Sequence, residues 1–215
     1  MTANLIILFG APGSGKGTVA QYLKDKYDLH YFSTGNLLRN EVKEKTDVGL
    51  KVESILGVGG LAGDDIVNEI VAKNIDRVRG DEKIVLLDGY PRTKNQAVVL
   101  DGIWDTDSIR VMELDVNPEE VIFRISRRRI CARCGSTYGP TDKIDVCPCG
   151  GELIKRKDDE EATVRNRLKE YERATLPLLL YYSDRSVKIC GEGAPEEVVK
   201  RVDDCLCNWG IGKRR

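Results

Sequence analysis

This sequence carries almost no net charge: 34 lysines and arginines stand against 35 aspartates and glutamates in 215 residues. A charge near −1 gives no general attraction to nucleic acid or to an anionic membrane surface. The chain also lacks long hydrophobic runs, and none approaches the length of a membrane span. No basic region precedes the first apolar run, Leu5–Phe9, which is itself too short for a signal peptide. We therefore expect a protein that binds neither nucleic acid nor membranes.

The cysteines indicate the cellular compartment and suggest that the protein binds a metal. Seven of them occur without a recognisable export signal. This combination favours a reducing compartment, in which cysteines bind metal more often than they form disulfides. We expect a cytoplasmic protein built as one α/β domain with small insertions, because 215 residues is an ordinary length for one domain.

Short apolar, β-branched runs alternate with helical patterns along most of the chain. The runs predict strands at Leu5–Phe9, Ile84–Leu87, Ile109–Leu114 and Val187–Cys190, with a weaker candidate at Leu29–Phe32. Helices are predicted at Gly15–Tyr27, Asp64–Ile75, Thr93–Ile103, Pro118–Arg128, Glu160–Tyr182 and Pro195–Cys207, with Pro177 bending or breaking the fifth. This alternation indicates an α/β fold, a parallel sheet with helices on both faces, whose ligands bind beyond the carboxyl ends of the strands.

Two segments interrupt the alternation. Residues 34–67 hold helical patterns and a glycine cluster but no strand pattern, and residues 130–157 are rich in cysteine and glycine. We therefore predict a core made of residues 1–33, 68–129 and 158–215, with two insertions at the edge of the sheet.

A glycine-rich segment, GAPGSGKGT from Gly10 to Thr18, follows the first predicted strand and precedes a helix. Its glycines let consecutive backbone N–H groups turn inward around an anion, and the amino-terminal end of the helix adds positive potential. Lys16 would reach the β- and γ-phosphates of ATP or GTP. Gly17 stands where a hydroxyl usually binds Mg²⁺, so phosphates, water and another residue must hold the metal. A glycine-rich turn of an unrelated α/β protein is the alternative, which the strand–loop–helix context disfavours.

A second polar motif ends the strand predicted at Ile84–Leu87. Asp88 would face the glycine-rich segment, where a carboxylate can hold Mg²⁺ through water molecules. Arg92, four residues on, can contact a phosphate with two N–H groups. An aspartate that merely caps the next helix is the alternative role for Asp88.

Five motifs occur in order along the chain: GAPGSGKGT, STGNLLR, LLDGYPRT, RISRRRICARCG and RKDDEEATVRNRL. In order and spacing they resemble those of the adenylate kinases, a family of nucleoside monophosphate kinases, and of its members with a long zinc-bearing lid. The resemblance covers essentially the whole chain. It implies a monomer that reversibly transfers a phosphoryl group from MgATP to AMP, giving two ADP. It also implies a P-loop NTPase-type core, an α-helical AMP-binding insertion over 34–67 and a small lid over 130–157.

The resemblance assigns residues to both nucleotides. ATP would be held by Gly10, Ala11, Pro12, Gly13, Ser14, Gly15, Lys16, Gly17, Thr18, Arg124 and Arg128. AMP would be held by Thr34, Gly35, Arg39, Leu61, Ala62, Gly89, Arg92, Gln96, Arg156 and Arg167. The catalytic residues would be Lys16, Asp88, Arg92, Arg128, Arg156 and Arg167. Phosphoryl transfer depends mainly on positioned positive charge, and the accepting phosphate is already an anion, so His30 needs no catalytic role.

The cysteines of the second insertion form two pairs of different spacing. The first is a CxxCG knuckle, which is typical of zinc sites, whereas the second has a single residue between its cysteines. The sequence predicts a structural zinc ion bound by Cys131, Cys134, Cys147 and Cys149. Asp145 is a substitute ligand if one thiol faces away, and free thiols or a disulfide are the alternatives. The remaining cysteines are expected to be small core residues or surface thiols: Cys190, Cys205 and Cys207.

The acceptor and the class of protein each have an alternative. UMP, CMP or GMP could replace AMP, although Thr34 and Gln96 match the family's base-contacting positions and favour adenine. A zinc-ribbon module that binds nucleic acid is a more remote alternative, because Arg127–Arg129 lie beside the knuckle. That alternative leaves the glycine-rich segment unexplained, and the same arginines suit the solvated end of a helix.

Two residues depart from the family pattern. Asn36 stands where the family commonly has aspartate, which weakens any closed-state ion pair with a lid arginine to a hydrogen bond. Arg127 replaces a customary glycine at the entrance to the lid, where a stiffer hinge would alter lid opening.

Overall fold

The computed structural model describes residues 4–212; residues 1–3 and 213–215, which belong to the predicted core segments, lie outside that range. Its strands are β1 Leu5–Phe9, β2 Leu29–Ser33, β3 Ile84–Asp88, β4 Ile109–Asp115, β5 Arg129–Cys131, β6 Thr137–Tyr138, β7 Leu153–Ile154 and β8 Ser186–Cys190. Its α-helices are α1 Lys16–Lys26, α2 Thr34–Glu44, α3 Asp47–Gly57, α4 Asp64–Asp76, α5 Lys94–Ile103, α6 Pro118–Ser126, α7 Glu161–Glu170, α8 Leu178–Tyr181 and α9 Pro195–Asn208. Short 3-10 turns lie at Thr106–Ser108, Lys157–Asp159 and Ser183–Arg185, and a π-helical segment lies at Tyr171–Thr175.

The central sheet is parallel and has the strand order β2-β3-β1-β4-β8. Leu5 of β1 pairs with Val85 on one side and Ile109 on the other, so β1 lies in the middle of the sheet. Every predicted strand is present with ends shifted by at most one residue, including the weak candidate at Leu29. The loop after β1 therefore opens between the carboxyl ends of β3 and β4, where parallel sheets bind their ligands.

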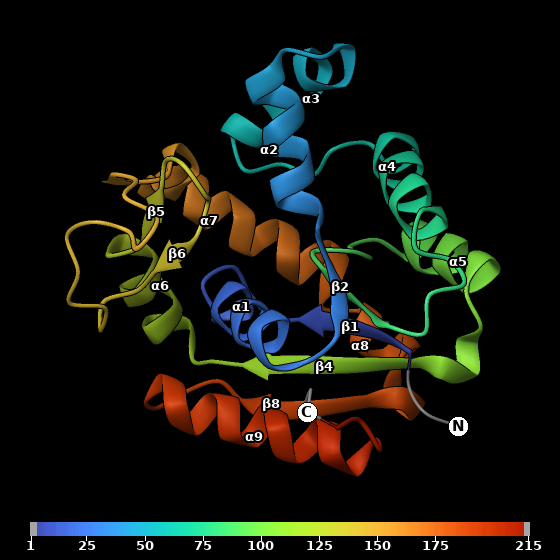
Figure 1. Cartoon of the computed structure of the whole chain (residues 1–215). Coiled ribbons are helices and arrows are strands. Elements are labelled where there is room, and N and C mark those ends of the chain that lie inside the picture. Colours follow the sequence, from blue (N-terminus) through green and yellow to red (C-terminus); the bar gives the residue numbers. More distant parts are fainter. Residues whose placement is uncertain (1–3, 213–215) are drawn as a thin grey trace.

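Helices cover both faces of this sheet, as the alternation predicts (Figure 1). On one face, Val19 and Leu23 of α1 and Val202 of α9 pack on inward-facing residues of the strands. The other face is covered by α4, α5 and α8, which contribute Val67, Val71, Ile75, Ala97, Leu100 and Leu178. The α/β fold class is confirmed. Along residues 4–212, every helix is too short or too polar to cross a lipid bilayer.

Two additions project from this core (Figure 1). Helices α2 and α3 form one, and they lie within the predicted insertion over 34–67. That predicted range also contains the first turn of α4, whose Val67 belongs to the core cluster. The other addition is a small antiparallel sheet in the order β6-β5-β7, which lies in the predicted lid over 130–157 except for Arg129, the first residue of β5. Its strands are only two or three residues long, so they leave no periodic pattern in the sequence.

Two predicted helices have different ends in the structure. The helical stretch predicted over Glu160–Tyr182 is broken at Pro177 as expected, since α8 begins at Leu178, but it is also interrupted earlier, because α7 ends at Glu170 and a π-helical segment follows it. The N–H of Leu176 donates to the carbonyl oxygen of Tyr171 at 2.8 Å, so the helix widens before it reaches Pro177. Helix α6 stops at Ser126, short of the predicted Arg128, because β5 begins at Arg129.

Candidate active site

The glycine-rich segment forms the loop between β1 and α1 and lines a cavity of about 1150 Å³. Gly15 has a φ of 98°, in the left-handed region that favours glycine, and it caps α1. A Cβ atom on Gly13 would lie 2.6 Å from Cγ1 of Ile125 in α6, so the loop is held tightly from outside. The first residues of α1, from Lys16 to Thr18, line this cavity, and the unpaired N–H groups of a helix start provide a ready site for an anion.

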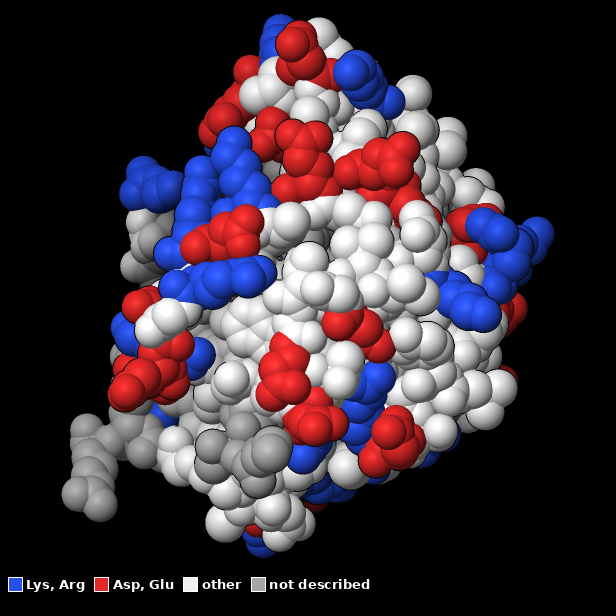
Figure 2. All heavy atoms as spheres, turned by 90° about the vertical axis from the view of Figure 1, so that its right-hand side faces the viewer, with Lys and Arg blue, Asp and Glu red and all other residues white. Residues whose placement is uncertain are grey.

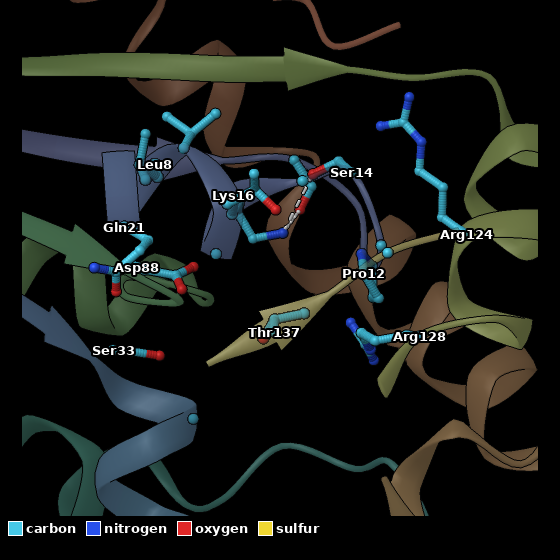
Figure 3. Close-up of a pocket in the computed structure, with 18 of the residues that line it drawn as sticks. Leu8, Pro12, Ser14, Lys16, Gln21, Ser33, Asp88, Arg124, Arg128 and Thr137 are labelled. Carbon is cyan, nitrogen blue, oxygen red and sulfur yellow. Dashed lines mark hydrogen bonds between the residues drawn. The ribbon is translucent and has the colours of Figure 1, made fainter. Parts of the chain in front are cut away.

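Lys16 is the first residue of α1 and bends back over the loop (Figure 3). Its ammonium group donates to the carbonyl oxygens of Gly10 at 2.7 Å and Ala11 at 2.9 Å. Burial lowers the pKa of Lys16 to about 8, although the carboxylate of Asp88 acts in the opposite direction. Lys16 therefore loses its proton at a lower pH than an ordinary lysine does.

Asp88 ends β3, beside β1, and lines the same cavity (Figure 3). The hydroxyl of Tyr31, on the neighbouring strand β2, donates to its Oδ2 atom at 3.0 Å. The alternative role of a helix cap is wrong, because Thr93 caps α5 by accepting from the N–H of Gln96. A fixed carboxylate facing a phosphate-binding loop is the type of oxygen ligand that Mg²⁺ accepts, directly or through water.

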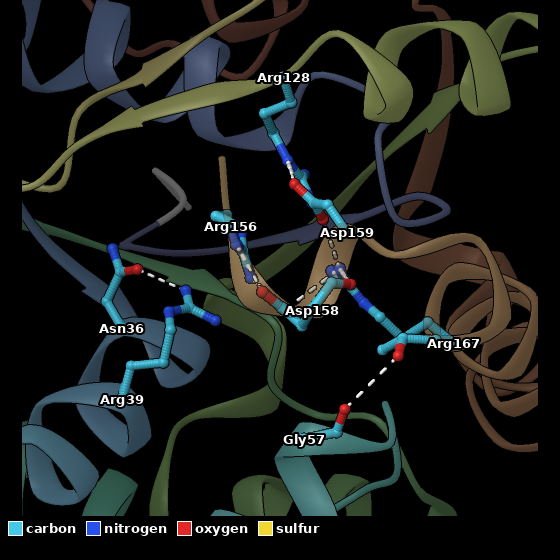
Figure 4. Close-up of polar contacts among 9 residues, drawn as sticks. Asn36, Arg39, Gly57, Arg128, Arg156, Asp158, Asp159 and Arg167 are labelled. Atoms are coloured by element: carbon cyan, nitrogen blue, oxygen red, sulfur yellow. Dashed lines mark hydrogen bonds and ion pairs between the residues drawn. The ribbon is translucent and has the colours of Figure 1, made fainter. Parts of the chain in front are cut away.

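Three arginines converge on the cavity and are held by two adjacent aspartates (Figure 4). Arg128 donates from Nε to Oδ2 of Asp159 at 2.7 Å, and its Nη2 bonds the other oxygen. Arg167 donates to Oδ1 of Asp159 at 3.2 Å and also lies 3.2 Å from Oδ2 of Asp158. Arg156 donates from Nε to Oδ1 of Asp158 at 2.9 Å. The carboxyl group of Asp159 is fully buried, so it sets the orientation of two guanidinium groups at once.

The electrostatics of this cluster favour an anionic ligand. Burial and neighbouring positive charges, which the aspartates only partly offset, lower the pKa of Arg167 to about 10. Burial and the nearby Arg156 lower the pKa of Arg39 to about 9. Burial would raise the pKa of Asp158, but its bond to Arg156 holds that pKa below the usual range. A phosphate bound among these groups would offset the repulsion between the arginines.

Arg92 also lines the cavity, and its Nε donates to the carbonyl oxygen of Gly89 at 3.0 Å. Behind it lies Gln96, which is only 2% exposed. Its Oε1 accepts from the backbone N–H of Arg92 at 2.7 Å, and its Nε2 donates to Oδ1 of Asp64 at 2.7 Å. These two bonds fix which end of the amide points in which direction.

Most predicted site residues line the one cavity. These are Gly10, Pro12, Gly13, Ser14, Gly15, Lys16, Gly17, Thr18, Gly35, Arg39, Leu61, Asp88, Gly89, Arg92, Arg124, Arg128, Arg156 and Arg167. Ala11, Thr34, Ala62 and Gln96 are not among its lining residues, and the last three are buried. Arg165, two residues before Arg167, is exposed and pairs with Glu161. His30 lies 2.8 Å from Asp81 and takes no part in the cavity wall.

The four cysteines of residues 130–157 come together. Their sulfur atoms all lie within 4.8 Å of one another, with Cys131 and Cys149 at 3.4 Å and Cys134 and Cys147 at 3.5 Å. Four thiolates about 2.3 Å from a tetrahedral zinc ion have sulfur atoms about 3.8 Å apart, so the cluster fits that metal. Asp145 is fully exposed and pairs with Arg129 at 3.9 Å, outside the cluster. Among the described cysteines outside it, Cys205 is buried while Cys190 and Cys207 are exposed.

Comparison with known proteins identifies this arrangement. A family model described as adenylate kinase matches residues 8–187. The chain belongs to the adenylate kinase family. It is 39% identical over 214 residues to adenylate kinase of Caldicellulosiruptor bescii, covering 96% of this chain and 99% of that protein. It is 43% identical over 213 residues to the Trichlorobacter lovleyi enzyme, covering 94% and 98%, and 40% identical over 206 residues to that of Methanocella arvoryzae, covering 91% and 95%.

As a member of this family the chain is a phosphotransferase that uses a phosphate group as acceptor. Sequence reasoning missed some residues that shape its site, namely Asp158 and Asp159, which orient the arginines, and Tyr31, which bonds Asp88. The two aspartates stand inside the RKDDEE motif, so the signal was present in the sequence. Tyr31 had no such signal, because its contact depends on the pairing of β2 with β3.

The two departures from the adenylate kinase pattern have local partners. Asn36 accepts from Nη2 of Arg39 at 2.6 Å, within α2 (Figure 4). Arg127 lies over the ring of Phe123 at 4.1 Å from its centroid, so its side chain packs on α6 at the start of the predicted lid. Arg124 is also held, by Glu120 at 2.7 Å and by the carbonyl oxygen of Gly191 at 2.9 Å.

Nucleotide binding by this family member should weaken as pH rises above about 8. In the ligand-free chain Lys16 loses its proton near that pH, whereas a bound phosphate raises its pKa, so binding takes up a proton. The dissociation constant for ADP should therefore rise roughly tenfold per pH unit above about 8. Calorimetry in two buffers of different ionisation heat measures the uptake. In a Lys16→Arg variant, ADP binding should no longer take up this proton. An affinity of the unaltered chain that stays constant between pH 7 and 9 would contradict the expectation.

Proposed function

We propose that the chain catalyses the reversible reaction MgATP + AMP = 2 ADP and so maintains the balance of adenine nucleotides. The observation that carries this proposal is that the glycine-rich loop, Asp88 and the arginine cluster all line one cavity. Phosphoryl transfer requires two anionic substrates held in line with positive charge around the moving group. The lining of this cavity combines the glycine-rich loop, which can hold phosphates, with Arg39 and Arg92.

In the proposed reaction an oxygen of the AMP phosphate attacks the γ-phosphorus of ATP. The bond from that phosphorus to its bridging oxygen breaks, and ADP leaves with the electron pair. Lys16 and the loop N–H groups hold the β- and γ-phosphates, while Arg92 holds the accepting phosphate. Arg128, Arg156 and Arg167 contact the transferred group, and the aspartates that fix them keep these arginines in place before substrate arrives.

The Mg²⁺ that accompanies ATP would be held by Asp88 and the phosphates. When bound, it offsets the charge that develops on the phosphate oxygens. Asp88 suits this task, because Tyr31 anchors one carboxylate oxygen and the group lines the cavity beside the loop. The absence of a hydroxyl at Gly17 then removes nothing essential.

AMP is the proposed acceptor because of the orientation of Gln96. The bonds to Arg92 and Asp64 use one lone pair of Oε1 and one N–H of Nε2. The remaining lone pair and N–H of Gln96, which stands behind the cavity lining, would pair with the amino group and N1 of adenine, and the assay separates adenine from cytosine, which presents the same donor and acceptor. A coupled assay with AMP, UMP, CMP and GMP tests this assignment. Faster turnover with UMP than with AMP would favour the alternative acceptor.

A structural zinc ion in the lid is the second part of the proposal. The four clustered sulfur atoms support it, and no open ligand position is needed for a metal that only ties a small segment together. Elemental analysis of native protein should find about one zinc per chain. Protein without metal would refute the site.

Removal of that metal by a chelator should lower the melting temperature by an amount on the order of 5 °C. The core should still bind ADP, because the glycine-rich loop follows β1 of the parallel sheet and is no part of the small β6-β5-β7 sheet. Differential scanning calorimetry with and without chelator, followed by restoration of zinc, makes the measurement. An unchanged melting temperature after complete removal would contradict a structural role.

A cytoplasmic monomer that binds neither nucleic acid nor membranes completes the proposal. The near-zero net charge supports it, and so does the surface in Figure 2, where acidic and basic groups lie side by side over the face that carries α4 and α5. Sedimentation analysis tests the oligomeric state. Salt-dependent RNA binding would instead support the zinc-ribbon alternative.

A further inference from the structure

The two cysteine pairs of the lid close the same turn with different numbers of residues. In the first pair, the N–H of Gly135 donates to the carbonyl oxygen of Cys131, four residues earlier, at 3.0 Å. In the second pair, the N–H of Gly150 donates to the carbonyl oxygen of Cys147, three residues earlier, at 2.7 Å. The second turn is therefore one residue shorter.

The shorter turn changes what surrounds the sulfur atoms. In the first pair, the backbone N–H groups of Arg133 and Cys134 both donate to Sγ of Cys131 at 3.4 Å. Such N–H···S bonds stabilise a thiolate. In the second pair, the N–H group three residues after Cys147 is already used to close the turn. Cys147 thus lacks the donor that its counterpart Cys131 receives from Cys134.

A side chain stands at Cys147 instead. The hydroxyl oxygen of Tyr138 lies 3.0 Å from Sγ of Cys147, which is 4% exposed. Tyr138 belongs to β6 and pairs with Arg129 of β5, so its backbone is anchored in the small sheet. A thiolate bound to a metal carries no proton, so in the loaded protein the phenol must be the donor. Ligands in metal sites need such outer partners to set their orientation and charge.

We propose that Tyr138 is a positioning residue of the lid metal site, whose hydroxyl replaces the backbone N–H that the shortened turn takes from Cys147. This inference rests on the proposed metal site. It explains how Cys147 and Cys149, with one residue between them, can bind the metal together with the regular knuckle of Cys131 and Cys134. It also connects the metal with the nucleotide cavity, because Tyr138 lines that cavity next to Thr137.

The test uses the full-length chain loaded with Co²⁺, which takes the place of zinc and has a sulfur-to-metal charge-transfer band. In Tyr138→Phe the Cys147 thiolate loses a hydrogen-bond donor, which raises the energy of the sulfur electrons. The sulfur-to-cobalt charge-transfer band should therefore move to longer wavelength. Zinc affinity, measured by competition with a chromophoric chelator, should fall about tenfold. Tyr181→Phe is the matched control, because the Tyr181 hydroxyl donates to Asp101, away from the lid. Its band and affinity should equal those of the unaltered chain.

Replacement of Tyr138 by 3-fluorotyrosine preserves shape and strengthens the donor, so the band should move to shorter wavelength even if the phenylalanine variant does not fold. An unaltered chain without a thiolate-to-cobalt band would refute the metal site itself. A normal band in the unaltered chain that neither replacement at Tyr138 moves would overturn the role of Tyr138 alone.

Discussion

Replacing Lys16 with alanine is expected to lower kcat/KM by on the order of 10³-fold or more. The ammonium group lies at the start of α1, bonded to the carbonyl oxygens of Gly10 and Ala11, beside the place where the phosphates bind. It supplies positive charge from a half-buried position in the cavity wall, where an electrostatic interaction is stronger than in bulk water. Steady-state kinetics with ATP and AMP as varied substrates measure the loss.

The matched control is Lys26→Ala, at the exposed end of the same helix and outside the cavity lining. This variant should retain normal activity, since it removes the same charge from α1 without touching the loop. Full phosphotransfer by Lys16→Ala would contradict the mechanism as proposed.

Replacing Asp159 with asparagine is expected to harm both stability and activity. The carboxylate is fully buried and bonds Arg128 and Arg167, so its neutral replacement leaves the largely buried Arg128 without its carboxylate partner and Arg167 with Asp158 alone. Breaking a buried pair in this way costs about 3 kcal/mol in the free energy of unfolding. The arginines also lose their fixed orientation, and a misplacement of about 1 Å can lower kcat by on the order of 10²-fold. Urea denaturation and steady-state kinetics measure the two effects separately.

Glu161→Gln gives the comparison on the neighbouring helix α7. Glu161 pairs with Arg165, but both side chains are largely exposed, and such surface pairs contribute well under about 1 kcal/mol. Stability and kcat should both stay near their normal values. If Asp159→Asn behaved like Glu161→Gln, the aspartate would have no role in positioning the arginines.

The sheet and the phosphate loop could be predicted because local patterns specify them. A five-residue apolar run such as Leu5–Phe9 is recognisable alone, and so is a glycine-rich loop that follows it. The break in the helix at Tyr171 could not be predicted, because the carbonyl bonded by Leu176 depends on local geometry and not on a helix-breaking residue. The small β6-β5-β7 sheet could not be predicted either, because strands of two residues are too short to show a periodic pattern.

Within the site, residue types could be predicted and partners could not. The motifs place Arg128 and Arg167 near the phosphates, but only the folded chain brings both to the carboxylate of Asp159. Likewise, Gln96 was predicted as a base contact, whereas the bond to Asp64 that orients it joins residues 32 apart. The assignment of each residue to ATP or AMP remains a prediction.

The contact between Gly13 and Ile125 has a consequence for how such enzymes are recognised and altered. The glycine-rich loop keeps its shape partly because an isoleucine on α6 fills the space that a side chain at Gly13 would need. The shape of the glycine-rich loop therefore depends on a second residue outside the motif, the apolar Ile125, which lies far along the chain. Grafting the loop onto another scaffold, or exchanging α6 between relatives, will succeed only when the loop and this residue are transferred together.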